Sequence, residues 1–255
     1  MRISRDQHLK FEQEGLLVVK SVFAFDVVKS LRRELEEAIK QDIEQNTDVF
    51  DVGMVHNCMV RGKQMERALA HPVLNDYINA LFTPHAIVYA YQSSSLNPNS
   101  TNYGSRIHVD CPRFIPNYMT NLGVIIALDD FTSQNGGTHY LPGSHLSPDV
   151  PSEEEFIQKS VQLECHKGSV VFFNGRIFHA AGVNKTNKTR HALTINYCRP
   201  YMRQRFDFPR LIPKAQLDAM DKLTKKRIGY DVRVPSRLDE FYLPVEKRLY
   251  KPGQE

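Results

Sequence analysis

The chain has 255 residues, of which 41% are hydrophobic and 24% are charged, with 13 glycines and 14 prolines. These proportions are typical of a globular protein and exclude collagen-like, low-complexity and wholly disordered chains. The formal net charge of +4 is small for this length, and it argues against a nucleic-acid partner, which would require a stronger basic stripe. No apolar run approaches the roughly 20 residues that span a bilayer, and the polar N-terminus lacks the apolar stretch of a signal peptide. The composition therefore predicts a cytoplasmic protein without a membrane span.

The first third of the chain, residues 1–85, is expected to be mainly helical. A short apolar run at 15–19 suits a strand. Asp26 can cap the helix that follows, whose apolar positions recur at spacings of three and four residues as far as Ile43. A second helical segment covers roughly 64–82 and should end near the proline that follows.

Short apolar segments separated by glycine, asparagine and proline turns dominate residues 86–200. The expected strands cover 86–95, 106–110, 122–128, 138–141, 161–165, 169–173, 176–180 and 191–198. Several short strands at regular spacing predict a sandwich or barrel. The dipeptide Asn174-Gly175 between two apolar runs predicts a hairpin.

The remaining residues, 201–255, mix proline, arginine and aromatic side chains and show no strand pattern. One helix is expected over 214–226. We interpret this part as an extension that packs on the core, so that residues 1–255 form a single domain.

A candidate metal site begins with His108 and Asp110. On a strand these two side chains project to one face, while Ile107 and Val109 project to the opposite, buried face. The pair offers one imidazole nitrogen and one carboxylate oxygen to a single ion. His179 adds a second imidazole from another expected strand, and two histidines with one carboxylate form the facial triad of non-haem Fe(II) oxygenases.

Arg190 follows His179 by eleven residues and opens an apolar strand. An arginine at a strand start is ordinarily a solvated charge. Directed into a barrel it needs an anionic partner, because an unpaired buried guanidinium is costly. A dicarboxylate cosubstrate would supply that partner through two hydrogen bonds.

Together these motifs resemble the phytanoyl-CoA dioxygenase family of Fe(II)- and 2-oxoglutarate-dependent oxygenases. The motifs are His108-x-Asp110, the run Asn135–His145, the run Gly168–Phe173, His179 and Arg190. They occupy roughly residues 10–200 in the family's order and with its spacing from the second histidine to the arginine. The resemblance implies a mainly β fold with flanking helices, built on a double-stranded β-helix (jelly-roll, cupin-like) core.

The resemblance also implies residue roles. It makes His108, Asp110 and His179 the catalytic ligands of Fe(II), and Arg190 the partner of the distal carboxylate of 2-oxoglutarate. The expected reaction hydroxylates a C–H bond of a small organic molecule, consumes O2 and 2-oxoglutarate, and releases succinate and CO2, with ascorbate as a supporting reductant.

Two further residues are candidates for cosubstrate binding. Gln92 resembles a polar residue that touches the cosubstrate in some relatives, and Thr138 follows a glycine pair from which it could face the same molecule. Many relatives carry serine or threonine two residues after the second histidine. Ala181 stands at that position here and cannot make a hydroxyl contact.

Other functions compete with the hydroxylase. In the related halogenases glycine or alanine replaces the carboxylate ligand, so Asp110 argues against that reaction; a related oxidase is a further alternative. A non-catalytic jelly-roll protein that binds a metal or small ligand is the alternative of a different class, and Arg190 at the family's spacing argues against it.

The substrate is the least determined feature, and the oligomeric state is open. Candidates for the mouth of the site are Tyr103, Arg113, Phe114, Tyr118, Asn196, Arg199, Tyr201 and Arg203. If the arginines among them converge with Arg205 at one rim, they would attract an anionic substrate. The alternative is that they are solvated surface charges.

Overall fold

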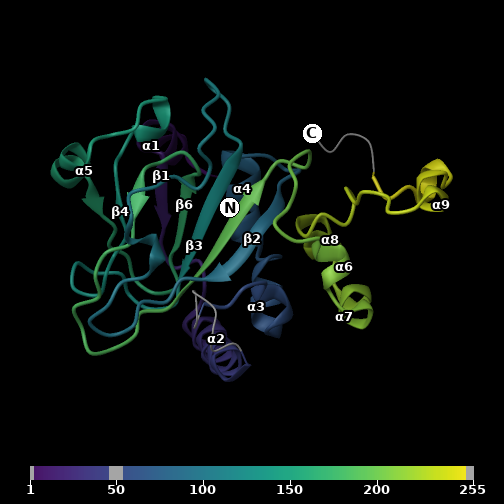
Figure 1. Ribbon diagram of the computed structural model, residues 1–255, viewed down its shortest axis with the longest axis horizontal. Helices are drawn as coiled ribbons and strands as arrows, with labels where there is room; N and C mark the ends of the chain where they lie inside the picture. Colours follow the sequence, from purple (N-terminus) through teal and green to yellow (C-terminus); the bar gives the residue numbers. More distant parts are fainter. Residues whose placement is uncertain (1–2, 46–53, 251–255) are drawn as a thin grey trace.

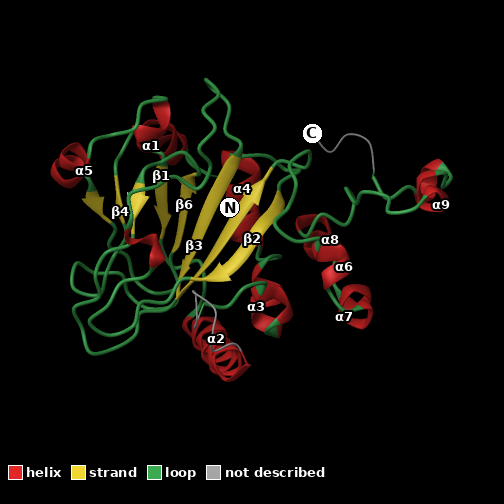
Figure 2. Cartoon of the chain, viewed as in Figure 1, coloured by secondary structure: helices red, strands yellow, loops and turns green. Residues whose placement is uncertain are grey.

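Two antiparallel sheets face each other at the centre of the computed structural model, which describes residues 3–45 and 54–250 (Figures 1 and 2). The large sheet has the strand order β1-β6-β3-β8-β2, and the small sheet has the order β5-β4-β7. The strands are β1 (Leu16–Val19), β2 (Ile87–Ser93), β3 (Asn121–Ala127), β4 (His139–Tyr140), β5 (Val161–Gln162), β6 (Val170–Asn174), β7 (His179–Ala180) and β8 (Ala192–Cys198). This confirms the jelly-roll with flanking helices.

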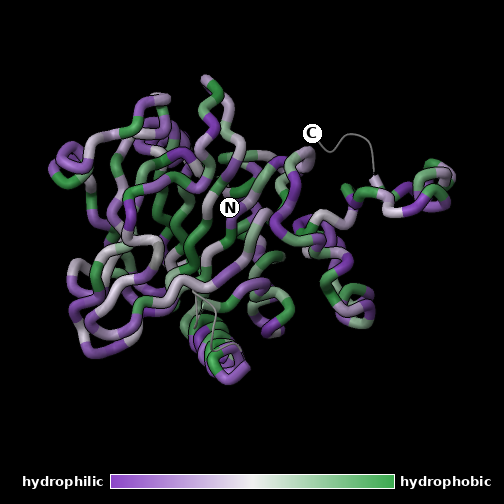
Figure 3. Tube along the Cα trace, in the orientation of Figure 1, coloured by the Kyte–Doolittle hydropathy of each residue, from purple (hydrophilic) through white to green (hydrophobic). Residues whose placement is uncertain are grey.

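Alternation along the strands divides the apolar core into layers. In β3, Leu122, Val124 and Ile126 pack toward the helices, while Ala127 and partly buried Ile125 pack toward the small sheet. Figure 3 shows the strands of the large sheet as largely hydrophobic. The large sheet is therefore covered on both faces, and any polar residue that points between the sheets stands out from its neighbours.

The helices surround the sheets. They are α1 (Arg5–Glu14), α2 (Phe25–Gln45), α3 (Lys63–Ala68), α4 (Pro72–Leu81), α5 (Glu153–Lys159), α6 (Phe208–Leu211), α7 (Lys214–Ala219), α8 (Lys222–Arg227) and α9 (Leu238–Phe241). Helix α2 confirms the predicted periodicity, with Leu31 and Leu35 fully buried. It begins at Phe25, so Asp26 lies in its first turn and is not the cap.

Two predicted helices are each broken in two. The segment 64–82 divides into α3 and α4 because Pro72 lacks a backbone N–H and begins a new helix at its first position. The segment 214–226 divides into α7 and α8. Asp221 starts α8, since its carboxylate accepts hydrogen bonds from the backbone N–H groups of Leu223 and Thr224.

The predicted hairpin at Asn174-Gly175 is wrong. Strands β6 and β7, on either side of this turn, belong to different sheets. The Gly175 backbone N–H donates to the Asn121 carbonyl at 2.9 Å, and the chain crosses from the large sheet to the small one. The crossing brings β7 opposite the inner face of the large sheet.

The first half of the C-terminal part packs on the helix-covered face of the large sheet. Phe208 and Ile228 are fully buried there, and the guanidinium of Arg227 donates to Asn75 and to the Ala86 carbonyl. Helix α9 stands apart from the sheets (Figure 1). Within residues 3–45 and 54–250, no helix combines the length and apolar character that crossing a membrane requires.

Gly123 faces the inside of the sandwich on β3, directly opposite Phe173 of β6 and Asn196 of β8. A Cβ at this position would overlap the Phe173 ring. We therefore expect Gly123→Ala to lower the free energy of unfolding by about 1–3 kcal/mol, the usual cost of overpacking. Urea denaturation measures this change. In a Phe173→Leu background the same substitution should cost less, and an equal cost in both backgrounds would contradict the clash.

Candidate metal centre

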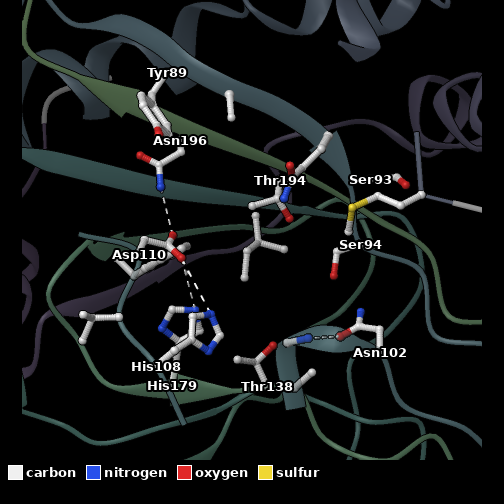
Figure 4. A pocket seen from close by; sticks show the side chains of 18 of the residues that line it. Tyr89, Ser93, Ser94, Asn102, His108, Asp110, Thr138, His179, Thr194 and Asn196 are labelled. Carbon is white, nitrogen blue, oxygen red and sulfur yellow. Dashed lines mark hydrogen bonds and ion pairs between the residues drawn. The ribbon is translucent and has the colours of Figure 1, made fainter. Parts of the chain in front are cut away.

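His108, Asp110 and His179 come together on the wall of a cavity of about 320 Å3 between the two sheets (Figure 4). One donor atom from each lies within 4.8 Å of the other two. The Asp110 Oδ1 is 3.8 Å from the His108 Nε2 and 3.7 Å from the His179 Nε2. Two imidazole nitrogens and one carboxylate oxygen thus face a common point.

The backbone positions the two histidines as direct neighbours. The His108 N–H donates to the His179 carbonyl at 3.0 Å, and the His179 N–H donates back at 2.9 Å. The sequence predicted a strand over 106–110, but within that segment the structure forms a single β-bridge, between His108 and His179. On either side of this pair the register shifts, since the Cys111 N–H donates to the Gly175 carbonyl and the Ala181 N–H donates to the Gly104 carbonyl. The alternation of faces nevertheless holds, because Ile107 and Val109 pack against the apolar cluster beneath α5.

Backbone carbonyls also fix which nitrogen of each ring faces the centre. The Nδ1 of His108 is 2.7 Å from the Arg106 carbonyl, and the Nδ1 of His179 is 3.0 Å from the Ile177 carbonyl. Since a carbonyl can only accept, each Nδ1 carries the proton and each Nε2 keeps a lone pair. Burial lowers the pKa of His179, which Asp110 opposes and His108 reinforces.

Arg190 lies deep between the sheets and is 2% exposed. Its guanidinium stacks 4.1 Å from the centroid of the Phe131 ring, and within the described residues its Nε has no hydrogen-bond partner. Burial lowers the pKa of Arg190 to about 10, and the nearby Asp129 carboxylate opposes this shift. The side chain therefore remains a cation at neutral pH, and its Nε is a buried donor that an anionic group could satisfy.

Gln92 and Thr138 both line the cavity, as does Ala181. The Gln92 Oε1 accepts a hydrogen bond from the Arg205 Nη1 at 3.2 Å. The structure thus places both predicted polar residues on the wall that also carries the three candidate ligands.

The arginines expected at one rim do not converge. Of these arginines only Arg205 lines the cavity. It also lines a neighbouring cavity together with Arg203, whereas Arg113 is exposed and lines neither. Arg199 is held away by the Met119 carbonyl and by ring contacts. Phe114, Tyr118 and Tyr201 do not line the cavity either, and Tyr103 lies outside the side chains that the structure describes.

Sequence reasoning missed several polar residues of the cavity wall, namely Tyr89, Ser94, Asn102 and Thr194. It named Asn196 only as a mouth residue, whereas the structure bonds its Nδ2 to the Asp110 Oδ2 at 3.0 Å. A signal was present on β8. Thr194 and Asn196 are polar side chains on one face of the otherwise apolar strand that Ala192 begins. A buried strand carries polar side chains where it lines a site.

Comparisons with known proteins agree with this arrangement. The family model of phytanoyl-CoA dioxygenase matches residues 11–192. An uncharacterised protein of Mycobacterium tuberculosis is 30% identical over 189 residues, which are 74% of this chain and only 64% of that relative's length. The peroxisomal phytanoyl-CoA dioxygenase of Rattus norvegicus is 24% identical over 76% of this chain and 68% of its own.

Among solved structures, the fold is similar to that of the non-haem α-ketoglutarate-dependent carbocyclase SnoK from nogalamycin biosynthesis. The TM-score is 0.61 and the identity 20%, over 77% of this chain and 84% of the carbocyclase. The match of the family model to most of the chain, on a jelly-roll that carries the His-Asp-His cluster, shows that the chain belongs to the phytanoyl-CoA dioxygenase family of non-haem, 2-oxoglutarate-dependent oxygenases.

Proposed function

We propose that this protein is an Fe(II)- and 2-oxoglutarate-dependent dioxygenase that hydroxylates a C–H bond of a small organic molecule. The observation that supports this most strongly is the convergence of His108, Asp110 and His179 on an open cavity. The donor set of two imidazoles and one carboxylate fits Fe(II) and leaves coordination positions for other ligands. Mn(II), Co(II) or Zn(II) would fit the same donors, because geometry alone does not select iron.

Arg190 would bind the distal carboxylate of 2-oxoglutarate. It precedes β8 by two residues, so strand alternation places it in one row with Thr194 and Asn196 along the inner face. Asn196 contacts Asp110 at one end of the row. At the other end lies the Nε of Arg190, which has no hydrogen-bond partner in the described part of the chain. Gln92 and Thr138 would contact the cosubstrate between these ends.

When bound, Fe(II) and 2-oxoglutarate supply the oxidising chemistry, in which O2 is reduced and the cosubstrate is converted to succinate and CO2. The protein's own residues bind and orient. The backbone carbonyls behind His108 and His179 hold both rings in the metal-binding tautomer. Arg190 neutralises the distal carboxylate in a site shielded from water, where a charge-assisted hydrogen bond is strong.

The test is succinate formation by the purified chain with Fe(II), ascorbate, 2-oxoglutarate and O2, in a screen of acyl-CoA thioesters, amino acids, phosphonates and natural products. We expect one class to raise succinate above the uncoupled rate and to yield a product heavier by one oxygen atom. A desaturated or ring-closed product would show that the reaction is a desaturation or a ring closure and not a hydroxylation. Binding of Fe(II) and 2-oxoglutarate without any succinate would favour the non-catalytic alternative.

We also propose that the substrate carries a negative charge near Arg205. Apart from the histidines of the metal centre, Arg205 is the one cationic residue among the described lining residues. Its backbone N–H donates to the Tyr89 carbonyl at 3.0 Å, and among the described residues its side chain donates a hydrogen bond to the uncharged Gln92 and forms no ion pair. A carboxylate or phosphate of the substrate would supply the missing anion.

Substitution of Arg205 tests this substrate class. Arg205→Gln should raise the KM of an acidic substrate about 10–100-fold, the cost of one charge-assisted hydrogen bond. The matched control is Arg203→Gln, since Arg203 lines a different cavity and its loss should leave that KM unchanged. A neutral substrate whose KM is the same in Arg205→Gln and in the unaltered chain would refute the proposal.

A further inference from the structure

The two carboxylate oxygens of Asp110 have different surroundings (Figure 4). Oδ1 faces the Nε2 atoms of His108 and His179 at 3.8 and 3.7 Å. Oδ2 points the other way and accepts a hydrogen bond from the Asn196 Nδ2 at 3.0 Å. The carboxylate is therefore held with one oxygen toward the metal centre and the other turned to β8.

The side-chain amide of Asn121 fixes the orientation of the Asn196 side-chain amide. The Asn196 Oδ1 accepts a hydrogen bond from the Asn121 Nδ2 at 3.1 Å. A carboxylate oxygen can only accept, so Asn196 must present its NH2 group to Asp110 and its oxygen to Asn121. Asn121 must then present its own NH2 group. The chain of hydrogen bonds has one possible direction, and it ends on the Asp110 Oδ2.

The strand register places these amides where they can reach Asp110. Asn121 lies on β3 and Asn196 on the neighbouring β8, and the residue paired with Asn196 is Gly123. The missing side chain at Gly123 leaves room for the Phe173 ring beside Asn196. Asn121 is 4% exposed, and in the described part of the chain its Oδ1 has no hydrogen-bond partner. An unsatisfied buried oxygen is costly, so the hydrogen bond to Asn196 is the role that accounts for an amide at this position.

We propose that Asn121 and Asn196 are positioning residues that hold Asp110 so that only its Oδ1 binds the metal. The inference rests on the proposed metal site. A carboxylate that gave both oxygens would occupy a fourth coordination position, whereas one oxygen with two imidazoles leaves three positions for 2-oxoglutarate and O2. The two histidines are oriented by backbone carbonyls, and this amide pair does the same for the third ligand.

The test is a titration of the metal-free protein with Co(II) alone, without cosubstrate or substrate. Calorimetry and the visible absorption bands of the bound ion monitor the binding. Asn196→Leu keeps the branched shape of the side chain and removes the donor. We expect the Co(II) affinity to fall about 10–100-fold, the usual cost of losing a ligand's hydrogen-bond partner. The absorption bands should also change, because Asp110 becomes free to bind through both oxygens. Asn121→Leu should shift affinity and spectrum in the same direction by less.

Thr194→Val is the matched control, since it removes a polar group from the same face of β8 and contacts no candidate ligand by a described hydrogen bond. It should leave the Co(II) affinity and spectrum unchanged. Asn196→Ser, which keeps a shorter donor, should recover part of the affinity. Circular dichroism and the Tm of the metal-free variants identify any that do not fold.

Wild-type affinity and spectrum in Asn196→Leu, or an equal loss in Thr194→Val, would overturn the role of the amides while leaving the metal site intact. If Asn196→Leu does not fold, Asn121→Leu decides by the same criterion, because it leaves Asn196 in place. Failure of the unaltered chain to bind Co(II) would instead refute the metal site, and with it the proposed function.

Discussion

Replacement of His108, Asp110 or His179 by alanine is expected to abolish turnover and to weaken Fe(II) binding by more than about 100-fold. Each side chain supplies one of the three donor atoms that meet at the centre, and losing a direct ligand costs more than the 10–100-fold typical of its hydrogen-bond partners. Calorimetric titration with Fe(II) under nitrogen, or with Mn(II) in air, measures the affinity. Succinate release measures turnover.

The fold should survive these three substitutions, because the candidate ligands lie around a cavity and outside the apolar clusters of the core. His166→Ala is the control, since the His166 side chain is 88% exposed and lies away from the cavity. Near-unaltered metal affinity and turnover in any one of the three variants would remove that residue from the metal site.

Arg190→Leu is expected to weaken 2-oxoglutarate binding at least 100-fold while Fe(II) affinity stays nearly constant. Leucine preserves apolar contact with Phe131 but removes the buried cation, and a carboxylate without its partner charge would be desolvated at a cost of several kcal/mol. Arg190→Lys should recover only part of the affinity, because an ammonium cannot reproduce the two parallel hydrogen bonds of a guanidinium.

The affinity for 2-oxoglutarate is measured by calorimetry on the protein loaded with Mn(II), which supports binding without turnover. Titration with succinate separates the contribution of the distal carboxylate from that of the metal-binding end. Unchanged 2-oxoglutarate affinity in Arg190→Leu would assign the distal carboxylate to another cation, and Arg205 would be the first to test.

The sequence predicted the parts of the fold that depend on local pattern. Short apolar segments bounded by turn residues located β3, β6 and β8 to within one residue at each end, and the spacing of apolar residues such as Leu31 and Leu35 located α2. The side-chain alternation around His108 was also correct, although its strand is reduced to a single pair. Two-residue periodicity determines which face a side chain takes even where the ladder of hydrogen bonds does not form.

Features that depend on contacts between distant segments were not predictable in this way. The Asn174-Gly175 turn has the local chemistry of a hairpin, but its partner is Asn121 in another strand. The bond between Asn196 and Asp110 joins residues 86 positions apart, and no spacing rule signals such a pair. Arginine positions in a loop say equally little about which of them reaches the cavity.

The single backbone pair between His108 and His179 has a consequence for local stability. A pair outside a continuous ladder can open by local fluctuation while the sandwich stays folded. An ion held by both side chains would have to leave before the pair could open, so at 100 times its Kd it would add about 2.7 kcal/mol to the free energy of opening. Such an ion would therefore hold together two segments 71 residues apart in sequence. Metal occupancy of the centre and the protection of the His108 and His179 backbone amides from hydrogen exchange would then increase together. Loss of the metal would destabilise this pair before it destabilises the fold.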